Sequence, residues 1–343
     1  MRRALLALLL LGAAPQPAVR GDLLLASDAP RLADYGLFDA SGNPAPGVAP
    51  YTLGTPLFSD HAEKFRYVWL PPGTRASYRA SGALAFPVGT VLIKRFAFPA
   101  DLRQPARDLR PVETRLLIHR ATGWVALSYV EEGGEAVLKR AGKRVPVNVI
   151  GQDGQPLAID YAVPNQNQCK QCHQAGEAIT PIGPTAGNLN HGLNGAGQSQ
   201  MVQWQATGRL DGLPATGVPQ LARWDDPKQP LAARARAYLA VNCGHCHDRA
   251  GFASNSGLYL GPEEATPAHL GILKRPVAAG RGSGGREFSI QPGNPDASIL
   301  VHRMESSEPG IMMPQFGRSM PHREGVALIR AWISAMDPAA PAG

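Results

Sequence analysis

Alternation of apolar and polar positions marks the first part of the chain as β structure. Residues 92–98 are rich in β-forming side chains, and residues 112–118 place every second side chain on one face. The turn Ala121-Thr122-Gly123 then returns the chain into residues 124–130 as an antiparallel partner. The pattern predicts a mainly β, sandwich-like domain over residues 22–160.

Helical spacing replaces this alternation in the last third of the chain. Residues 231–241 form a run of Ala, Arg, Tyr and Leu, and residues 324–336 repeat apolar side chains three and four positions apart. A third helix is predicted over residues 295–304, with Asn294 as its N-cap and Pro295 in its first position.

The N-terminus has the pattern of a secretory signal peptide. Arg2 and Arg3 precede an apolar run over residues 4–11, and small residues follow. This run is too short to span a bilayer, and no other long apolar stretch occurs. We expect residues 1–20 to be removed and the mature chain, without a transmembrane segment, to be exported to the periplasm.

All four cysteines fall inside two copies of one pattern. Cys169-Lys170-Gln171-Cys172-His173 and Cys243-Gly244-His245-Cys246-His247 both read C-x-x-C-H, the attachment signature of a c-type haem. In such a site each thiol forms a thioether with a haem vinyl group, and the histidine becomes the proximal iron ligand. The sequence therefore predicts two covalently attached haem c groups, with His173 and His247 on the iron.

Other uses of the cysteines fit the pattern less well. A four-cysteine zinc site would need closer pairs and gives no reason for a histidine after each second cysteine. A disulfide within C-x-x-C is strained, and a thioredoxin-like site expects a single C-x-x-C in a βαβ setting. If the cysteines attach haem, the chain has several domains. The mainly β, sandwich-like domain (22–160) is then followed by two α-helical cytochrome c-type haem segments, at residues 161–226 and 227–337.

The sixth iron ligands are predicted from the remaining Met and His residues. Met313 precedes a proline in the loop before the last predicted helix, where cytochromes c carry their axial methionine, and Met312 and Met320 are alternatives. For the first haem, Met201 is slightly favoured over His191. A five-coordinate first haem, open to a small molecule, is the third option.

Net charge and composition exclude one class of partner. The formal charge is +7, which loss of Arg2 and Arg3 lowers to +5, and no basic run interleaves with aromatic residues. Nucleic-acid binding is therefore not indicated. Gly 38 and Pro 32 predict many turns and loops. His61 and His119 are expected to be ordinary surface or packing residues.

Motifs along most of the mature chain resemble a known family of exported dihaem c-type cytochromes of unassigned function from proteobacteria, with a C-terminal cytochrome c-like domain. The matching stretches are residues 55–60, 86–90, 113–117, 168–173, 180–184 and 234–247. By resemblance to the small cytochromes c, the Pro184 carbonyl is expected to accept the Nδ1–H of His173. His245, inside the second motif, is a loose position that need not bind iron.

Two function classes follow from these motifs. An electron carrier would pass electrons between a donor and an acceptor, which we expect to be soluble or membrane-bound redox proteins. The alternative is a haem enzyme, either a dihaem peroxidase or the haem-bearing subunit of a periplasmic dehydrogenase, with a substrate-binding β domain. A peroxidase needs an open iron and a distal acid–base residue, and no His/Glu pair near either motif indicates one. A binding module built on the β domain is a third reading. The carrier is favoured.

Overall fold

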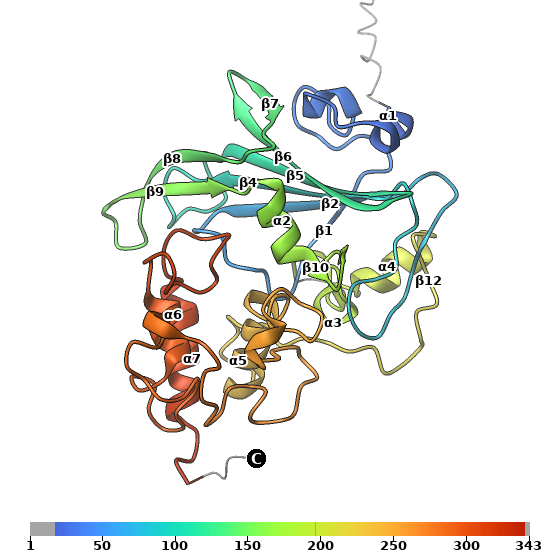
Figure 1. Ribbon diagram of the computed structural model, residues 1–343. Helices are drawn as coiled ribbons and strands as arrows, with labels where there is room; N and C mark the ends of the chain where they lie inside the picture. The colour runs from blue at the N-terminus through green and yellow to red at the C-terminus, as the bar shows by residue number, and fades with distance from the viewer. Residues whose placement is uncertain (1–17, 196, 340–343) are drawn as a thin grey trace, which may run out of the picture.

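The computed structural model describes residues 18–195 and 197–339. A six-stranded antiparallel sheet forms the centre of the molecule. Its strand order is β1-β2-β4-β5-β6-β7 (Figure 1). The strands are β1 (Ala49–Tyr51), β2 (Glu63–Trp69), β4 (Val91–Phe98), β5 (Arg110–Arg120), β6 (Gly123–Glu132) and β7 (Glu135–Leu138). The antiparallel pairing of residues 112–118 with residues 124–130 is present in β5 and β6.

Alternating side chains give this sheet two different faces. Ile93 and Leu116 belong to the face covered by helix α1 (Gly21–Ala26) and the 3-10 turn η1 (Leu32–Tyr35). Leu92 belongs to the opposite face, which is covered by the later part of the chain (Figure 1). Both faces are buried, which is why β4 is apolar in most positions rather than strictly alternating.

Shorter paired strands surround the main sheet. A long ribbon extends from it, formed by β8 (Lys143–Ile150) and β9 (Pro156–Val163). The parallel pair β3 (Ala76–Ser77) and β12 (Leu210–Asp211) and the hairpin β10 (Gln174–Ala175) and β11 (Ala178–Ile179) have two residues in each strand.

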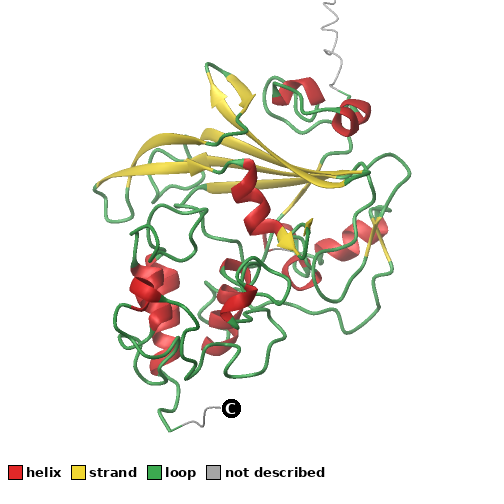
Figure 2. Cartoon of the chain, viewed as in Figure 1, coloured by secondary structure: helices red, strands yellow, loops and turns green. Residues whose placement is uncertain are grey.

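The helices of the later part are short and separated by long loops (Figure 2). They are α2 (Gln166–His173), α3 (Ala186–Leu189), α4 (Gln200–Ala206), α5 (Leu231–Asn242), α6 (Ile299–Glu305) and α7 (Arg323–Ser334), with 3-10 turns η2 (Leu193–Gly195), η3 (Ser254–Ser256) and η4 (Gly280–Ser283). Helices α5, α6 and α7 share one core, in which Leu239, Val301 and Ile329 are buried together.

The predicted fold class is wrong. The first part of the chain is β-rich, as predicted: helices and loops cover part of the main sheet, and the two-stranded ribbon of β8 and β9 packs against another part. Residues 161–226 and 227–337 are not two α-helical segments, because loops make up most of both. Helices were predicted correctly near residues 231–241 and 324–336, but α6 begins at Ile299 instead of Pro295. Frequent Gly and Pro stop helices after two or three turns.

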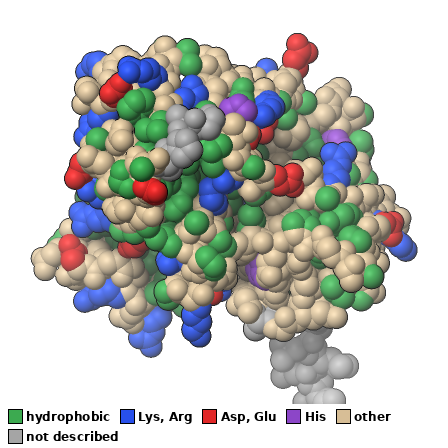
Figure 3. Space-filling model, turned by 90° about the horizontal axis from the view of Figure 1, so that it is seen from below, with side chains coloured by type: hydrophobic (Ala, Val, Ile, Leu, Met, Phe, Trp, Pro, Cys, Tyr) green, Lys and Arg blue, Asp and Glu red, His purple; other side chains and the backbone are tan. Residues whose placement is uncertain are grey.

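The signal-peptide prediction concerns Arg2, Arg3 and the apolar run over residues 4–11, which lie outside the described residues. In the part of the chain that the structure describes, every helix is too short or too polar to cross a bilayer. On the face seen in Figure 3, Lys and Arg side chains are spread among apolar and neutral ones.

Candidate haem-attachment site

Helix α2 positions the first C-x-x-C-H motif. Asn165 caps the helix, since its side chain accepts a hydrogen bond from the Gln168 backbone N–H at 2.9 Å, and the Gln168 side chain accepts one from the Asn165 N–H. One turn later Cys169 is buried against β6, and burial raises the pKa of its thiol. Spacing by three and four residues puts Cys172 and His173 on the same side of the helix as Cys169.

His173 is held as a neutral imidazole with one free ring nitrogen. Its Nδ1 lies 2.8 Å from the carbonyl oxygen of Thr180, which can only accept, so Nδ1 carries the proton and Nε2 a lone pair. Burial lowers the pKa of His173 to about 4. A neutral imidazole with an oriented ring and an available Nε2 is the form that ligates iron.

The acceptor for His173 is Thr180 rather than Pro184, so the role expected of Pro184 is wrong. The Pro184 carbonyl accepts a hydrogen bond from the Leu84 N–H at 3.0 Å instead. The hairpin of β10 and β11 folds Thr180 back beside the end of α2, which leaves Pro184 too far along the chain to serve the ring.

The end of α5 positions the second motif. Asn242, the last residue of this helix, accepts a hydrogen bond from the Phe58 N–H at 2.9 Å and donates one to the Tyr238 carbonyl at 3.0 Å. Cys243 follows as the C-cap, and burial raises the pKa of its thiol to about 12. The chain then turns tightly, and the His247 N–H donates to the Cys243 carbonyl at 2.9 Å.

His247 has the same protonation pattern as His173. Its Nδ1 lies 3.1 Å from the Ser256 hydroxyl, and that hydroxyl donates its own proton to the Ala253 carbonyl at 2.7 Å. Ser256 Oγ therefore accepts from His247 Nδ1–H, which leaves the lone pair on Nε2. Burial lowers the pKa of His247 to about 4.

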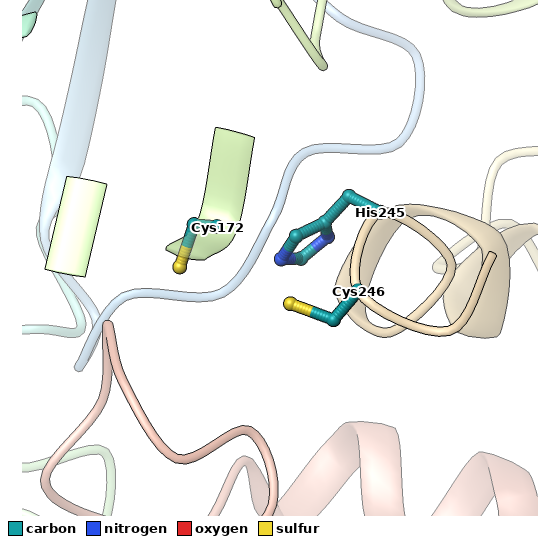
Figure 4. Close-up of side chains that lie close together, drawn as sticks. All are labelled: Cys172, His245 and Cys246. Carbon is teal, nitrogen blue, oxygen red and sulfur yellow. The ribbon is translucent and has the colours of Figure 1, made fainter. Parts of the chain in front are cut away.

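The two motifs meet in space, although they lie on separate segments of the chain. The side-chain ligand atoms of Cys172, His245 and Cys246 all lie within 4.8 Å of one another (Figure 4). The two neighbouring thiols interact, which lowers the pKa of Cys172 and raises that of Cys246. Cys169 and Cys243 are not part of this group, so the four cysteines do not form one zinc site.

A cavity of about 420 Å³ opens beside the second motif, and we call it the His247 cavity. Its lining contains Cys243, Cys246 and His247 together with Met313 and Met304. Most of its other walls are apolar, among them Phe252, Leu258, Leu260, Ile299, Leu300 and Phe316. Cofactor pockets are typically about 300–1,000 Å³ and mainly apolar. The volume, the donor atoms and the apolar walls fit a covalently attached haem.

Hydrogen bonds of its own backbone fix the loop that contains Met313. Its N–H donates to the Arg303 carbonyl at 3.0 Å, and its own carbonyl lies 2.7 Å from Nη2 of buried Arg318. Of the two alternatives, Met312 does not line the His247 cavity, and Met320 packs against the separate core formed with the β8–β9 ribbon. Met313 is therefore the methionine of the predicted set that shares a cavity with His247.

His173 lines a smaller cavity of about 90 Å³, which we call the His173 cavity. It shares Cys172, Cys243, His245 and Met313 with the lining of the His247 cavity, so the two adjoin. Its volume is below the usual cofactor range of about 300 Å³ and above. At the first motif the two thiols and the His173 imidazole are the groups that attach a haem. The volume of the His173 cavity is that of a small ligand.

Neither predicted sixth ligand of the first haem lies near His173. Met201, a residue of α4, is 1% exposed and is packed in a core with Trp204 and Leu210, and it lines neither cavity. Both ring nitrogens of His191 lie close to carbonyl oxygens, at 2.7 Å from Gly192 and 3.1 Å from Asn188, and its ring lines neither cavity.

Sequence reasoning missed several residues that the fold brings to the His173 cavity. Lys94 and Arg115 come from the main sheet, and Arg318 and His322 come from the segment before α7. His322 stacks on Phe58 with ring centres 4.1 Å apart, and burial lowers its pKa to about 4. These residues have no motif of their own, and the only signal was the appearance of basic residues within an otherwise apolar strand.

No protein-family model, curated protein or solved structure matches this chain. The geometry of the site is therefore the ground for a functional proposal.

Proposed function

We propose that the chain is a dihaem c-type cytochrome that transfers electrons between redox partner proteins. The observation that carries this proposal is the convergence of both C-x-x-C-H motifs, with Cys172 and Cys246 as neighbours and each motif opening onto a cavity. The resemblance to exported dihaem cytochromes and the signal-like N-terminus support a periplasmic location.

The residues of each motif have the roles that such a site requires. Cys169, Cys172, Cys243 and Cys246 would hold the two haems as thioethers, and Nε2 of His173 and His247 would ligate the irons. A bound haem supplies one-electron reduction and oxidation at iron. The protein keeps both imidazoles neutral by burial and orients them through Thr180 and Ser256.

Neighbouring attachment points support electron exchange within the chain. The sulfur atoms of Cys172 and Cys246 lie within 4.8 Å of each other. Because these residues belong to different motifs, the two attachment sites are next to each other. Met313 as a thioether ligand in the His247 cavity would favour ferrous iron and raise the potential of that site. Two adjacent sites of unequal potential suit directional passage of electrons.

Intact mass measurement tests the proposal. After acid denaturation, the mature chain should retain the mass of two haems, and replacing Cys243 and Cys246 by Ala should leave one. A polypeptide without added mass, purified from a host that attaches haem c, would overturn the proposal.

A second candidate is a mononuclear metal site, favoured by the group Cys172, His245 and Cys246. Two thiolates and one imidazole with an open fourth position form a known catalytic zinc arrangement. In that case metal analysis should find about one zinc per chain, removed by His245→Ala, with no haem absorbance. Haem attachment would consume both thiols, so the two candidates exclude each other.

A further inference from the structure

A row of cations crosses the inner face of the main sheet. Arg66 on β2 is the register partner of Lys94 on β4, and Lys94 is the register partner of Arg115 on β5. Like charges directly opposite on neighbouring strands destabilise a sheet. Arg115 is compensated by Glu113, whose carboxylate oxygens lie 2.7 and 2.8 Å from its guanidinium. The other two cations need a different source of negative charge.

Lys94 is partly exposed and Arg66 has Glu63 nearby, but neither cation forms an ion pair with a residue that the structure describes. The Lys94 ammonium lies 4.7 Å from the centre of the Phe96 ring, and it has no ion pair or side-chain hydrogen bond with any residue that the structure describes. Arg66 is 8% exposed, and its Nη2 is buried without a hydrogen-bond partner among those residues. Desolvating a cation without an ion pair is costly, so the row favours binding of an anion.

The His173 cavity continues this positive lining on its other side. Arg318 lines the cavity and is 6% exposed, and its Nη1 is buried without a hydrogen-bond partner in the described part of the chain. Its Nη2 is occupied by backbone carbonyls, the nearest being that of Met313 at 2.7 Å. Lys94, Arg115 and Arg318 thus line one cavity of about 90 Å³, and no Asp or Glu is among its lining residues.

We propose that the His173 cavity is a binding site for a small oxyanion of the carboxylate type, held by Lys94 and Arg318. The oxyanion belongs either to a free ion, which the volume of about 90 Å³ suits, or to a propionate of the first haem. Planar carboxylate oxygens accept charge-assisted hydrogen bonds from guanidinium and ammonium groups. The main sheet then supplies one wall of the first redox site instead of being a separate substrate domain.

Calorimetric titration of the purified full-length protein, in the state in which it is isolated, with sodium formate tests the free-ion source. We expect one formate site per chain, and at least about tenfold weaker binding in Lys94→Met, because a charge-assisted hydrogen bond is lost. Lys228→Met, at an exposed loop position, is the matched control and should bind formate like the wild type. Lys94→Gln provides a second variant of similar length, and circular dichroism checks that each variant is folded.

Potentiometry tests the propionate source, and this arm alone rests on the proposed function. If a propionate fills the site, formate should not bind, and Lys94→Met should lower the midpoint potential of one haem, since removal of a positive charge stabilises ferric iron. A tenfold shift in the reduction equilibrium corresponds to about 59 mV for one electron.

The proposal is overturned if folded Lys94→Met and Lys94→Gln change neither formate binding nor either midpoint potential. Haem counting by mass is done first on the same preparations. A chain without haem would defeat the proposed function while leaving the formate titration decisive for the oxyanion site.

Discussion

Asp60 and Ser319, 259 positions apart in the chain, are joined by three hydrogen bonds. Both carboxylate oxygens of Asp60 lie 2.8 Å from the Ser319 backbone nitrogen, and one lies 3.0 Å from its hydroxyl. Asp60 is 1% exposed and also accepts from the Met320 N–H at 3.2 Å. The link fastens the loop that carries Met313 and Arg318 to the segment before β2, and so fixes one side of both cavities.

Removal of the Asp60 carboxylate should destabilise the folded protein. Asp60→Ala leaves two backbone N–H groups and a hydroxyl without their acceptor, and we expect a loss of about 1–3 kcal/mol in the free energy of unfolding. Urea denaturation measures the change. Asp225→Ala, which removes an exposed partner of Arg223, should cost less than about 0.5 kcal/mol. Equal effects in the two variants would contradict the role given to Asp60.

Asp60 also predicts a pH dependence of stability. Burial raises its pKa above 3.8 in the folded protein, against the hydrogen bonds from Ser319 and Met320, which lower it. Between the unfolded and folded pKa values the folded protein binds more protons. The stabilising contribution of this proton is therefore complete below the unfolded pKa and is lost as pH rises through the folded pKa.

Asp60→Asn, which cannot titrate, isolates this contribution. Relative to that variant, the wild type should become less stable as pH rises from about 4 to about 7. Denaturation curves for both proteins across this range check the prediction. A wild type that gains stability over Asp60→Asn with rising pH would show that the folded pKa lies below the unfolded one.

Met313 is expected to be the sixth ligand of the second haem, as it lines the cavity that contains His247. Met313→Ala should abolish the weak sulfur-to-iron band of the oxidised protein, open one haem to carbon monoxide and lower its potential. Met320→Ala is the control, because Met320 packs against a different core. If Met320→Ala produces these changes and Met313→Ala none, the assignment is wrong.

Ser256 is expected to tune His247 through Nδ1, the ring nitrogen that would not bind a haem iron. Ser256→Ala removes the acceptor of the His247 Nδ1–H, which makes the imidazole a weaker electron donor. The midpoint potential of one haem should rise, with the other unchanged and both haems still attached. An unchanged pair of potentials would mean that water or another acceptor replaces the hydroxyl.

The sequence pattern alone predicts some helices, strands and motifs. The other features depend on contacts between residues far apart in the sequence. Residues 231–241 have strong helix formers and fold as α5, and the strands around Gly123 follow from alternation and a turn. Alternation shows that a strand has buried sides but not what covers them. The two α-helical segments predicted at residues 161–226 and 227–337 are wrong, because loops make up most of both.

At the candidate haem site, too, only the features set by local sequence could be predicted. The motif residues can be found by spacing, because C-x-x-C-H is a local pattern. Lys94 and Arg95 are the two basic residues of an otherwise apolar strand, and only the register of Lys94 with Arg66 and Arg115 reveals the cationic row. Met313 has a sequence argument, its place before a proline in the loop before the last helix, whereas Met201 was only slightly favoured over His191. The fold places Met313 in the lining of the His247 cavity and Met201 in a separate core.

Carbon monoxide separates an electron carrier from a haem enzyme. Ferrous haem binds carbon monoxide only where the sixth position is open or its ligand leaves easily. If both irons are six-coordinate, the reduced protein should not bind it, added peroxide should not turn over, and electrons should still pass to a small soluble cytochrome. Neither Met201 nor His191 lines the His173 cavity, so the first haem is where an open position is to be looked for.

The test is to compare the reduced wild type with His322→Ala and His245→Ala, which remove the two histidines other than His173 that line the His173 cavity. A ligating histidine reveals itself when its variant alone gains carbon monoxide binding at one haem. Rapid binding by the wild type, together with peroxide-dependent oxidation of a reduced donor, would contradict the carrier. Lys94 lines the His173 cavity, so in that case Lys94→Met should slow the oxidation while both haems stay attached.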